Sequence, residues 1–292
     1  MVDGIDHLVL CVRDLERARD LYRRLGFTLT PPARHPFGTG NSLVQFEERG
    51  FLELLALLDA NAVPPMRPGN FNFGAYNRDV LARQEGCSML VLESADAKAE
   101  ARTWRAAGLG DFEPFHFERP APLPDGSFKK VAFTLAFAVH RDLPDAVFFA
   151  CQQHAPEIFW RREYQRHDNG ALGIEEAAMV AADPLALAGL LESVAGRPAE
   201  RADGGLKCET GRGVLRALTP AAFSRRYAGA PAPSLARGPR FAGCRIRTAD
   251  LAALRSRLGE GKIAFAEADG ALVVPPAEAF GVALGFVQRS KR

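Results

Sequence analysis

Two residues on apolar strands, His7 and Glu53, are the first candidates for chemistry in this sequence. His7 lies in the apolar run Ile5–Val12, and Glu53 lies in the apolar run Phe51–Ala56. A carboxylate on an apolar strand face costs free energy to bury unless it is paired. An imidazole and a carboxylate are also side chains that transfer protons or ligate a divalent cation. Both residues are therefore candidates for a buried polar site.

The strand that contains His7 belongs to a pattern that the chain repeats. Gly4–Asp14 aligns without a gap with Gly173–Asp183, and two weaker copies end at Asp96 and Asp250. Each copy places an apolar strand before an aspartate, a helical pattern and a glycine, which is typical of an internal structural repeat. An aspartate at this place caps a helix by accepting amide hydrogens of the first turn. We therefore expect the repeated aspartates to be helix caps rather than catalytic acids: Asp14, Asp96, Asp183 and Asp250.

Short strands follow each helical pattern, so the chain reads as four β-α-β-β-β units. In the first unit we expect strands over Phe27–Thr30, Ser42–Phe46 and Phe51–Ala56. In the second unit the insert Arg119–Ser127 contains three prolines and is predicted to be a loop. The predicted fold class is α+β, with antiparallel sheets that carry their helices on one face.

The repeat also divides the chain into two halves. We expect residues 1–155 to form the first domain, 156–170 a linker and 171–292 a second domain, each domain with a core of its own. The linker assignment depends on the polar and aromatic sequence between the two halves, which has no strand or helix pattern.

Composition excludes several classes of function. A net charge of +2 on 292 residues leaves no excess of positive charge for nucleic acid or an anionic membrane. The five cysteines lack any CxxC pair, which argues against a disulfide framework or a structural zinc site. The sequence contains no phosphate-binding glycine motif and no Gly-x-Ser-x-Gly motif. With no signal-peptide pattern or membrane-length apolar run, we expect a cytoplasmic monomer or homodimer that binds a small molecule.

The paired units resemble the vicinal-oxygen-chelate superfamily, which includes glyoxalase I, extradiol dioxygenases and the bleomycin- and fosfomycin-resistance proteins. The resemblance is carried by the opening strand Ile5–Leu10 (Ile-Asp-His-Leu-Val-Leu) and the fourth strand Phe51–Leu54 (Phe-Leu-Glu-Leu). Together with that fourth strand, Gly38–Asn41 and Glu85–Leu92 look most like the glyoxalase-like domain proteins of this superfamily. The resemblance covers almost the whole chain. It implies that each pair of units curls into a half-open barrel whose cleft holds a divalent metal.

His7 and Glu53 match the first-strand and fourth-strand ligand positions of that superfamily. The resemblance therefore implies that they bind Zn, Ni, Mn or Fe, with Glu53 also serving as a catalytic general base. His154 is the further ligand that we expect, and the Cys151 thiolate is the alternative. The residues expected to contact the substrate are Asn41, Cys151 and Gln153.

The other units depart from the superfamily pattern. The second-unit position that matches His7 is Met89, or Ser88 if the strand slips by one residue, and the fourth strand of that unit has no glutamate. In the third unit, Glu176 and Arg216 stand at the two ligand positions. Because a guanidinium has no lone pair for a metal, we expect these two residues to form an ion pair. The second domain is thus expected to be degenerate and to lack a metal site.

Two classes of function stay open on these residues. One is a metal-dependent lyase, isomerase or dioxygenase that acts on a small oxygen-rich or carbonyl substrate. The other is a metal-free small-molecule binding protein of the bleomycin-resistance type. The His7–Glu53 pair favours the enzyme, and the missing second-unit ligands favour the binding protein. His35 is expected to be solvated or to lie in a loop that folds over the cleft.

Overall fold

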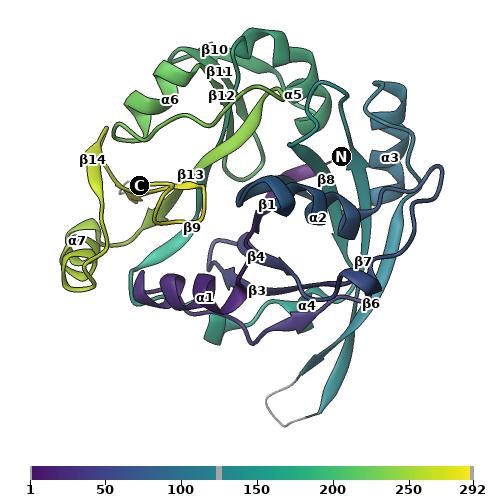
Figure 1. Ribbon diagram of the computed structural model, residues 1–292, viewed down its shortest axis with the longest axis horizontal. Coiled ribbons are helices and arrows are strands. Elements are labelled where there is room, and N and C mark those ends of the chain that lie inside the picture. Colours follow the sequence, from purple (N-terminus) through teal and green to yellow (C-terminus); the bar gives the residue numbers. More distant parts are fainter. Residues whose placement is uncertain (1, 123–126, 290–292) are drawn as a thin grey trace.

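The computed structural model describes residues 2–122 and 127–289, and these residues form two eight-stranded sheets with helices packed against them (Figure 1). The strands of the first sheet lie between Val2 and Gln153, and those of the second lie between Ala171 and Gln288. This two-domain α+β architecture confirms the predicted fold class. The limits 1–155, 156–170 and 171–292 for the domains and the linker stay a prediction. None of the described helices is long and apolar enough to cross a membrane.

The first sheet has the strand order β2-β3-β4-β1-β5-β8-β7-β6. Helices α1, α2 and α3 follow strands β1, β4 and β5 in the chain, and α4 follows β8. The bounds of these elements are β1 Val2–Cys11, α1 Leu15–Arg24, β2 Ala33–Arg34, β3 Thr39–Gln45, β4 Phe51–Leu57, α2 Phe73–Arg83, β5 Gly86–Ser94, α3 Ala97–Ala106, β6 Phe115–Pro122, β7 Phe128–Ala138, β8 Val147–Gln153 and α4 Pro156–Phe159.

The second sheet repeats this arrangement with the order β10-β11-β12-β9-β13-β16-β15-β14. Its elements are β9 Ala171–Val180, α5 Ala188–Ala195, β10 Ala199–Ala202, β11 Gly205–Glu209, β12 Val214–Leu218, α6 Pro220–Arg226, β13 Arg240–Thr248, α7 Leu251–Glu260, β14 Ala266–Ala268, β15 Ala271–Val274 and β16 Ala283–Gln288.

The expectation of purely antiparallel sheets is wrong in one respect. The first and last strands of each unit are neighbours and run parallel, as in the pairs β1–β4 and β5–β8. The helix and strands between them form the crossover that a parallel connection requires. The antiparallel pair β1–β5 then joins the first two units, and β9–β13 joins the last two.

The four repeated aspartates are helix caps, as predicted. The carboxylate of Asp14 accepts the amide hydrogen of Arg17 at the start of α1, and Asp96 accepts that of Ala99 at the start of α3. Asp183 and Asp250 do the same in the second half of the chain. Each therefore stabilises the first turn of a helix.

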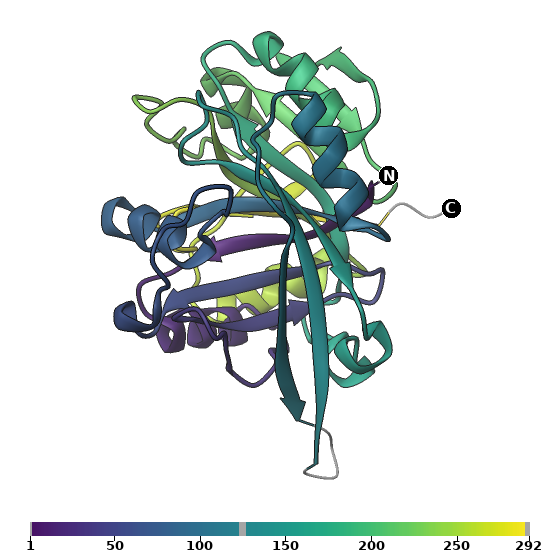
Figure 2. The same cartoon turned by 90° about the vertical axis from the view of Figure 1, so that its right-hand side faces the viewer.

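Two segments differ from the prediction. The residues of Phe27–Thr30 form no strand, and the short β2 is the strand that lies between α1 and β3. The insert Arg119–Ser127, expected to be a loop, instead lengthens the β6–β7 hairpin, which projects beyond the body of the molecule in Figure 2; residues 123–126 of it lie outside the described part. Pro120 and Pro122 are compatible with β6 because it is the edge strand of the sheet and needs no ladder hydrogen bonds on its outer side.

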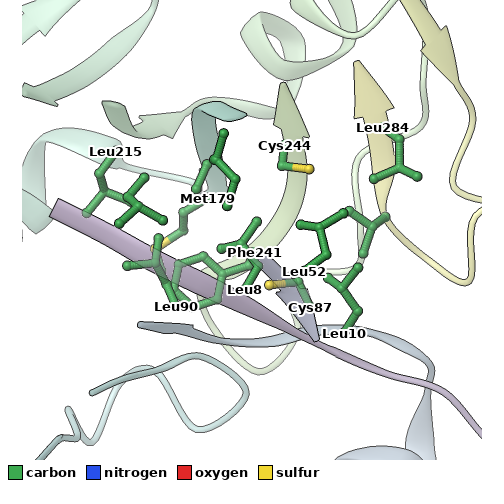
Figure 3. Close-up of a cluster of buried hydrophobic side chains, with 14 of the residues drawn as sticks. Leu8, Leu10, Leu52, Cys87, Leu90, Met179, Leu215, Phe241, Cys244 and Leu284 are labelled. Atoms are coloured by element: carbon green, nitrogen blue, oxygen red, sulfur yellow. The ribbon is translucent and has the colours of Figure 1, made fainter. Parts of the chain in front are cut away.

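The largest apolar cluster lies between the two sheets, so the expectation of two separate cores is only partly met. It joins the face of the first sheet that carries Leu8 and Leu90 to the face of the second that carries Met179 and Cys244 (Figure 3). Each sheet also has a separate apolar cluster on its opposite, concave face. The shared cluster holds the two domains together, and the concave faces are left for sites.

Candidate functional site

His7 and Glu53 lie on the same concave face of the first sheet. In the parallel pair β1–β4, His7 is opposite Phe51 and Val9 is opposite Glu53. The two polar residues are therefore diagonal neighbours on one face. Both are buried, at 4% and 5% exposure. The structure thus confirms the strand parity expected from the sequence.

A bulge in β1 brings Asp6 to the same site. The pairing of β1 with β5 runs from Ile5–Leu92 to His7–Val91, so Asp6 is an extra residue in its strand. Such an extra residue can re-aim a side chain. The Asp6 carboxylate accepts a hydrogen bond of 2.6 Å from His7 Nδ1. Because Nδ1 is used in this way, the other ring nitrogen, Nε2, is directed to the rest of the site.

His7 Nε2 lies 3.6 Å from Oε2 of Glu53, within ion-pair distance but longer than an ordinary hydrogen bond. The imidazole ring stacks on Phe51, with 4.1 Å between ring centres, and meets the edge of Phe149. These aromatic contacts hold the ring in one orientation.

The buried environment acts on the two ionisable groups in opposite ways. Burial alone would lower the pKa of His7, but the carboxylates of Asp6 and Glu53 outweigh it and raise that pKa above 6.5. Burial alone would raise the pKa of Glu53, but His7, His35 and the amide of Asn41 together lower it below 4.5. The geometry therefore favours an imidazolium beside a carboxylate.

Asn41 and His35 complete the polar part of the site. The Asn41 amide donates a hydrogen bond of 2.5 Å to Oε1 of Glu53, and its nitrogen lies 3.3 Å from Nε2 of His35. That His35 nitrogen is 4.0 Å from Glu53, and Nδ1 of His35 bonds to the hydroxyl of Thr39. Burial lowers the pKa of His35 to about 4, so this ring is neutral at neutral pH. The amide oxygen of Asn41 is buried with no partner among the described residues.

These polar groups open into a small pocket with about 470 Å³ of empty space, a value that includes open solvent at its mouth. Its wall is mostly aromatic. Seven phenylalanines line it: Phe37, Phe51, Phe73, Phe117, Phe133, Phe149 and Phe159. The pocket therefore suits a small molecule with a largely apolar body and a polar group for His7 and Glu53.

The remaining predicted site residues have different positions. Cys151 lines the pocket, but burial raises the pKa of its thiol well above the usual value, so it is not a thiolate. Gln153 does not line the pocket, and its amide donates to Asp6 at 3.1 Å. His154 is the exposed residue just after the end of β8, and its Nε2 bonds to the hydroxyl of Thr134. The structure therefore does not bring His154 together with His7 and Glu53.

The strand register shows what replaces the second half of the ligand set. His7 pairs with Val91 and Val9 with Met89, a symmetric arrangement in which Met89 is the counterpart of His7. Met89 pairs with Val147, as His7 pairs with Phe51, so Phe149 is the counterpart of Glu53. Both replacements are apolar and buried.

The donor set can be compared directly with what a metal needs. Two ligands at zinc distances of about 2.0–2.2 Å lie about 3.3–3.6 Å apart at the tetrahedral angle, which the spacing of His7 and Glu53 matches. The described residues, however, contain no group of three His, Cys, Asp or Glu side chains that could hold a metal ion. Half of the expected ligand set is present and half is replaced by Met89 and Phe149. These residues therefore do not fit the four-ligand centre that the resemblance implies.

The concave face of the second sheet is covered by charged side chains and by helix α6. Arg216 donates to Glu176 at 2.6 Å, which confirms the predicted ion pair, and Arg226 binds the same carboxylate. The Tyr227 hydroxyl also donates to Glu176, at 3.2 Å. A Cβ atom added to Gly243 would lie 2.7 Å from the Tyr227 ring, so this face has no space for a ligand beside that ring.

Sequence reasoning did not place Asp6 beside His7, nor Phe159 and Arg119 in the first pocket. Asp6 is adjacent to His7 in the chain, but strand alternation alone assigns it to the opposite face. Phe159 comes from the segment predicted as a linker, which Gln45 holds against the pocket by bonding the Phe159 carbonyl and the Arg161 amide. Arg119 comes from the insert predicted as a loop.

Comparisons with known proteins agree with this geometry at the level of fold. A hypothetical protein from Staphylococcus aureus is 13% identical and superposes with a TM-score of 0.66, covering 98% of this chain and 99% of that chain. A mutant of 4-hydroxymandelate synthase from Streptomyces coelicolor is 13% identical, with a TM-score of 0.59 and coverage of 99% and 94%. The Mn(II)-bound glyoxalase from Novosphingobium aromaticivorans is 12% identical, with a TM-score of 0.52 and coverage of 98% and 82%.

At these identities the likeness to solved structures shows the fold alone. No curated protein matches the sequence. The sequence model of the glyoxalase-like domain matches residues 5–195, which is more than half of the chain and includes His7, Glu53 and every strand of the first sheet from β2 onward. The chain therefore belongs to the glyoxalase-like domain family of the vicinal-oxygen-chelate superfamily.

Proposed function

We propose that the first pocket is the active site of an enzyme that moves a proton on a carbon next to a carbonyl group of a small substrate. The observation that carries this proposal is the buried pair of His7 and Glu53, 3.6 Å apart in an aromatic pocket. An acid and a base held together in a site of low polarity are the parts that isomerase and lyase chemistry of this kind requires.

Glu53 is the base in this proposal. Its lowered pKa keeps it ionised, and the hydrogen bond from Asn41 occupies Oε1 so that Oε2 faces the substrate. His7 is the acid, because its raised pKa keeps a proton on Nε2 while Asp6 holds Nδ1. Glu53 would remove a proton from carbon, and His7 would donate a hydrogen bond or a proton to the oxygen on which negative charge develops.

Proton exchange with solvent tests this reaction class without knowledge of the natural substrate. Small 2-oxo and 2-hydroxycarbonyl compounds are incubated with the protein in D₂O, and loss of their α-proton signals is followed by NMR. We expect loss for at least one compound with the wild type, and at least about 100-fold slower loss with Glu53→Gln. Exchange that is equal in both proteins, or absent for all compounds, would favour the binding-protein alternative.

A divalent cation held by His7 and Glu53 is the second candidate, and it would support a metal-dependent lyase, isomerase or dioxygenase. Its support is the spacing of the two side chains and the Mn(II)-bound glyoxalase among proteins of similar fold. Elemental analysis of protein purified without chelator tests it. Stoichiometric Zn, Ni, Mn or Fe that is lost in both His7→Ala and Glu53→Ala would establish this candidate.

A further inference from the structure

Arg119 is a guanidinium at the edge of the site with no carboxylate in ion-pair contact among the described residues. Its Nη1 lies 3.5 Å from the Pro120 carbonyl oxygen, and its Cζ lies 5.9 Å from the centre of the Phe133 ring. Burial lowers the pKa of Arg119, and the charge of Glu53 opposes that change. A partly desolvated guanidinium with one weak hydrogen bond has most of its donors left for a ligand.

A second pocket with about 550 Å³ of empty space lies beside the first. The two pockets share Asn41, Leu43, Arg119 and Phe159. The described wall of the second pocket has Arg119 and Arg161 as its charged side chains and contains no Asp or Glu. One molecule can therefore extend from the acid–base pair into a compartment with positive charge.

We propose that the substrate is a small carboxylic acid with an aromatic or similar apolar body, and that Arg119 binds its carboxylate in the second pocket. The apolar body then lies among the phenylalanines of the first pocket, with its reactive carbon facing His7 and Glu53. Arg119 is a specificity-determining residue in this arrangement.

The charge balance favours a monoanion such as a carboxylate over a phosphate. Arg161 already pairs with Glu163, at 3.4 Å, so Arg119 supplies the positive charge that has no counter-ion within ion-pair distance. The rest of the second pocket is mostly apolar, with Pro31, Ala121, Val131 and Ile158 among its lining residues. The planar guanidinium also matches the geometry of a carboxylate, which it can bind with two hydrogen bonds.

This inference rests on the proposed function for the position of the reactive carbon, but the anion site can be tested separately. Phenylacetate and phenylacetamide have the same shape and differ by one charge, and isothermal titration calorimetry measures the binding of each. We expect the wild type to bind phenylacetate at least about tenfold more tightly than phenylacetamide. Arg119→Gln should remove that preference, and Arg119→Lys should keep part of it. Arg102→Gln, which removes an exposed arginine on α3, is the matched control and should keep all of it.

Each outcome separates the two proposals. The anion site is overturned if both probes bind equally, or if phenylacetate shows no binding at a concentration of about 10 mM. It is also overturned if the Arg102 control loses the preference as Arg119→Gln does. Tighter binding of phenyl phosphate than of phenylacetate also overturns the assignment of a carboxylate. Glu53→Gln should retain the preference for phenylacetate, so that failure of the proton-exchange test with this preference intact would refute the reaction and not the anion site.

Discussion

His7 and Glu53 face each other across the parallel strands β1 and β4, with Nε2 3.6 Å from Oε2, and both side chains are almost inaccessible to solvent. Removing His7 leaves the buried carboxylates of Glu53 and Asp6 without their counter-ion, which costs more free energy than the pair itself contributes. Removing Glu53 leaves His7 paired with Asp6 alone. A double-mutant cycle can therefore measure the interaction free energy between the two residues.

We expect His7→Gln to lower the free energy of unfolding by about 3–5 kcal/mol. Glu53→Gln should lower it by less, because Asp6 still pairs with His7. The double variant should lose less than the sum of the two, because the His7–Glu53 interaction is then removed only once. Urea unfolding of the four proteins at pH 6 measures this cycle. Additive losses would mean that the two residues do not interact.

The pair also predicts a dependence of stability on pH. The pKa of His7 is raised above 6.5, so its contribution is complete below pH 6.5 and is lost as pH rises through the folded value. The pKa of Glu53 is lowered below 4.5, so its contribution is present above pH 4.5 and is lost as pH falls through the folded value. The difference in unfolding free energy between wild type and His7→Gln should therefore be largest at about pH 4.5–6.5 and decline on both sides. A difference that does not change between pH 4 and pH 9 would contradict the assignment.

The metal question has its own test in the second unit, where Met89 is the counterpart of His7. We expect Met89→His to increase the affinity for Zn²⁺ by at least about tenfold over the wild type, because it adds a third ligand to the cleft. Competition with a zinc indicator measures this affinity. Met179→His, at a buried position of β9, is the control. An equal effect in the control would show that the new histidine binds zinc outside the cleft.

The sequence predicted those features that depend on local periodicity. The repeated aspartates identified the helix starts, and strand alternation placed His7 and Glu53 on one face. It did not predict the place of Asp6, because a bulge in β1 breaks the alternation on which that reasoning depends. Nor did it predict Arg119 and Phe159 in the site, since their positions depend on contacts between segments far apart in the chain.

The parallel strand pairs show the same limit at the level of topology. The apolar pattern of Phe51–Leu57 indicates a strand, but only its pairing with β1 shows that it runs parallel. The shared core between the sheets likewise follows from tertiary packing. Leu8 and Met179 are each consistent with an ordinary half-buried strand, and only the structure joins them in one cluster.

Removal of a capping aspartate should lower the stability of the protein without weakening the binding of phenylacetate. Asp96→Ala removes the acceptor for the amide hydrogen of Ala99 and should lower the free energy of unfolding by about 1 kcal/mol. Binding of phenylacetate should stay within about twofold of the wild type, since α3 contributes no side chain to either pocket. Calorimetric titration and urea unfolding of one preparation give both values. Weaker binding at unchanged stability would instead assign Asp96 a functional role.

The last prediction separates the roles of the two domains. Glu176 is 1% exposed and pairs with both Arg216 and Arg226. Glu176→Gln removes their buried counter-ion and leaves each guanidinium only an exposed partner, Asp203 or Asp269. We expect it to lower the free energy of unfolding by about 3–5 kcal/mol. Proton exchange and phenylacetate binding should be unchanged at temperatures where the variant is folded, because the first pocket contains no residue of the second sheet. Glu260→Gln, an exposed change at the end of α7, is the control and should alter neither quantity. If Glu176→Gln abolished exchange in a folded protein while Glu53→Gln did not, the active site would lie in the second domain.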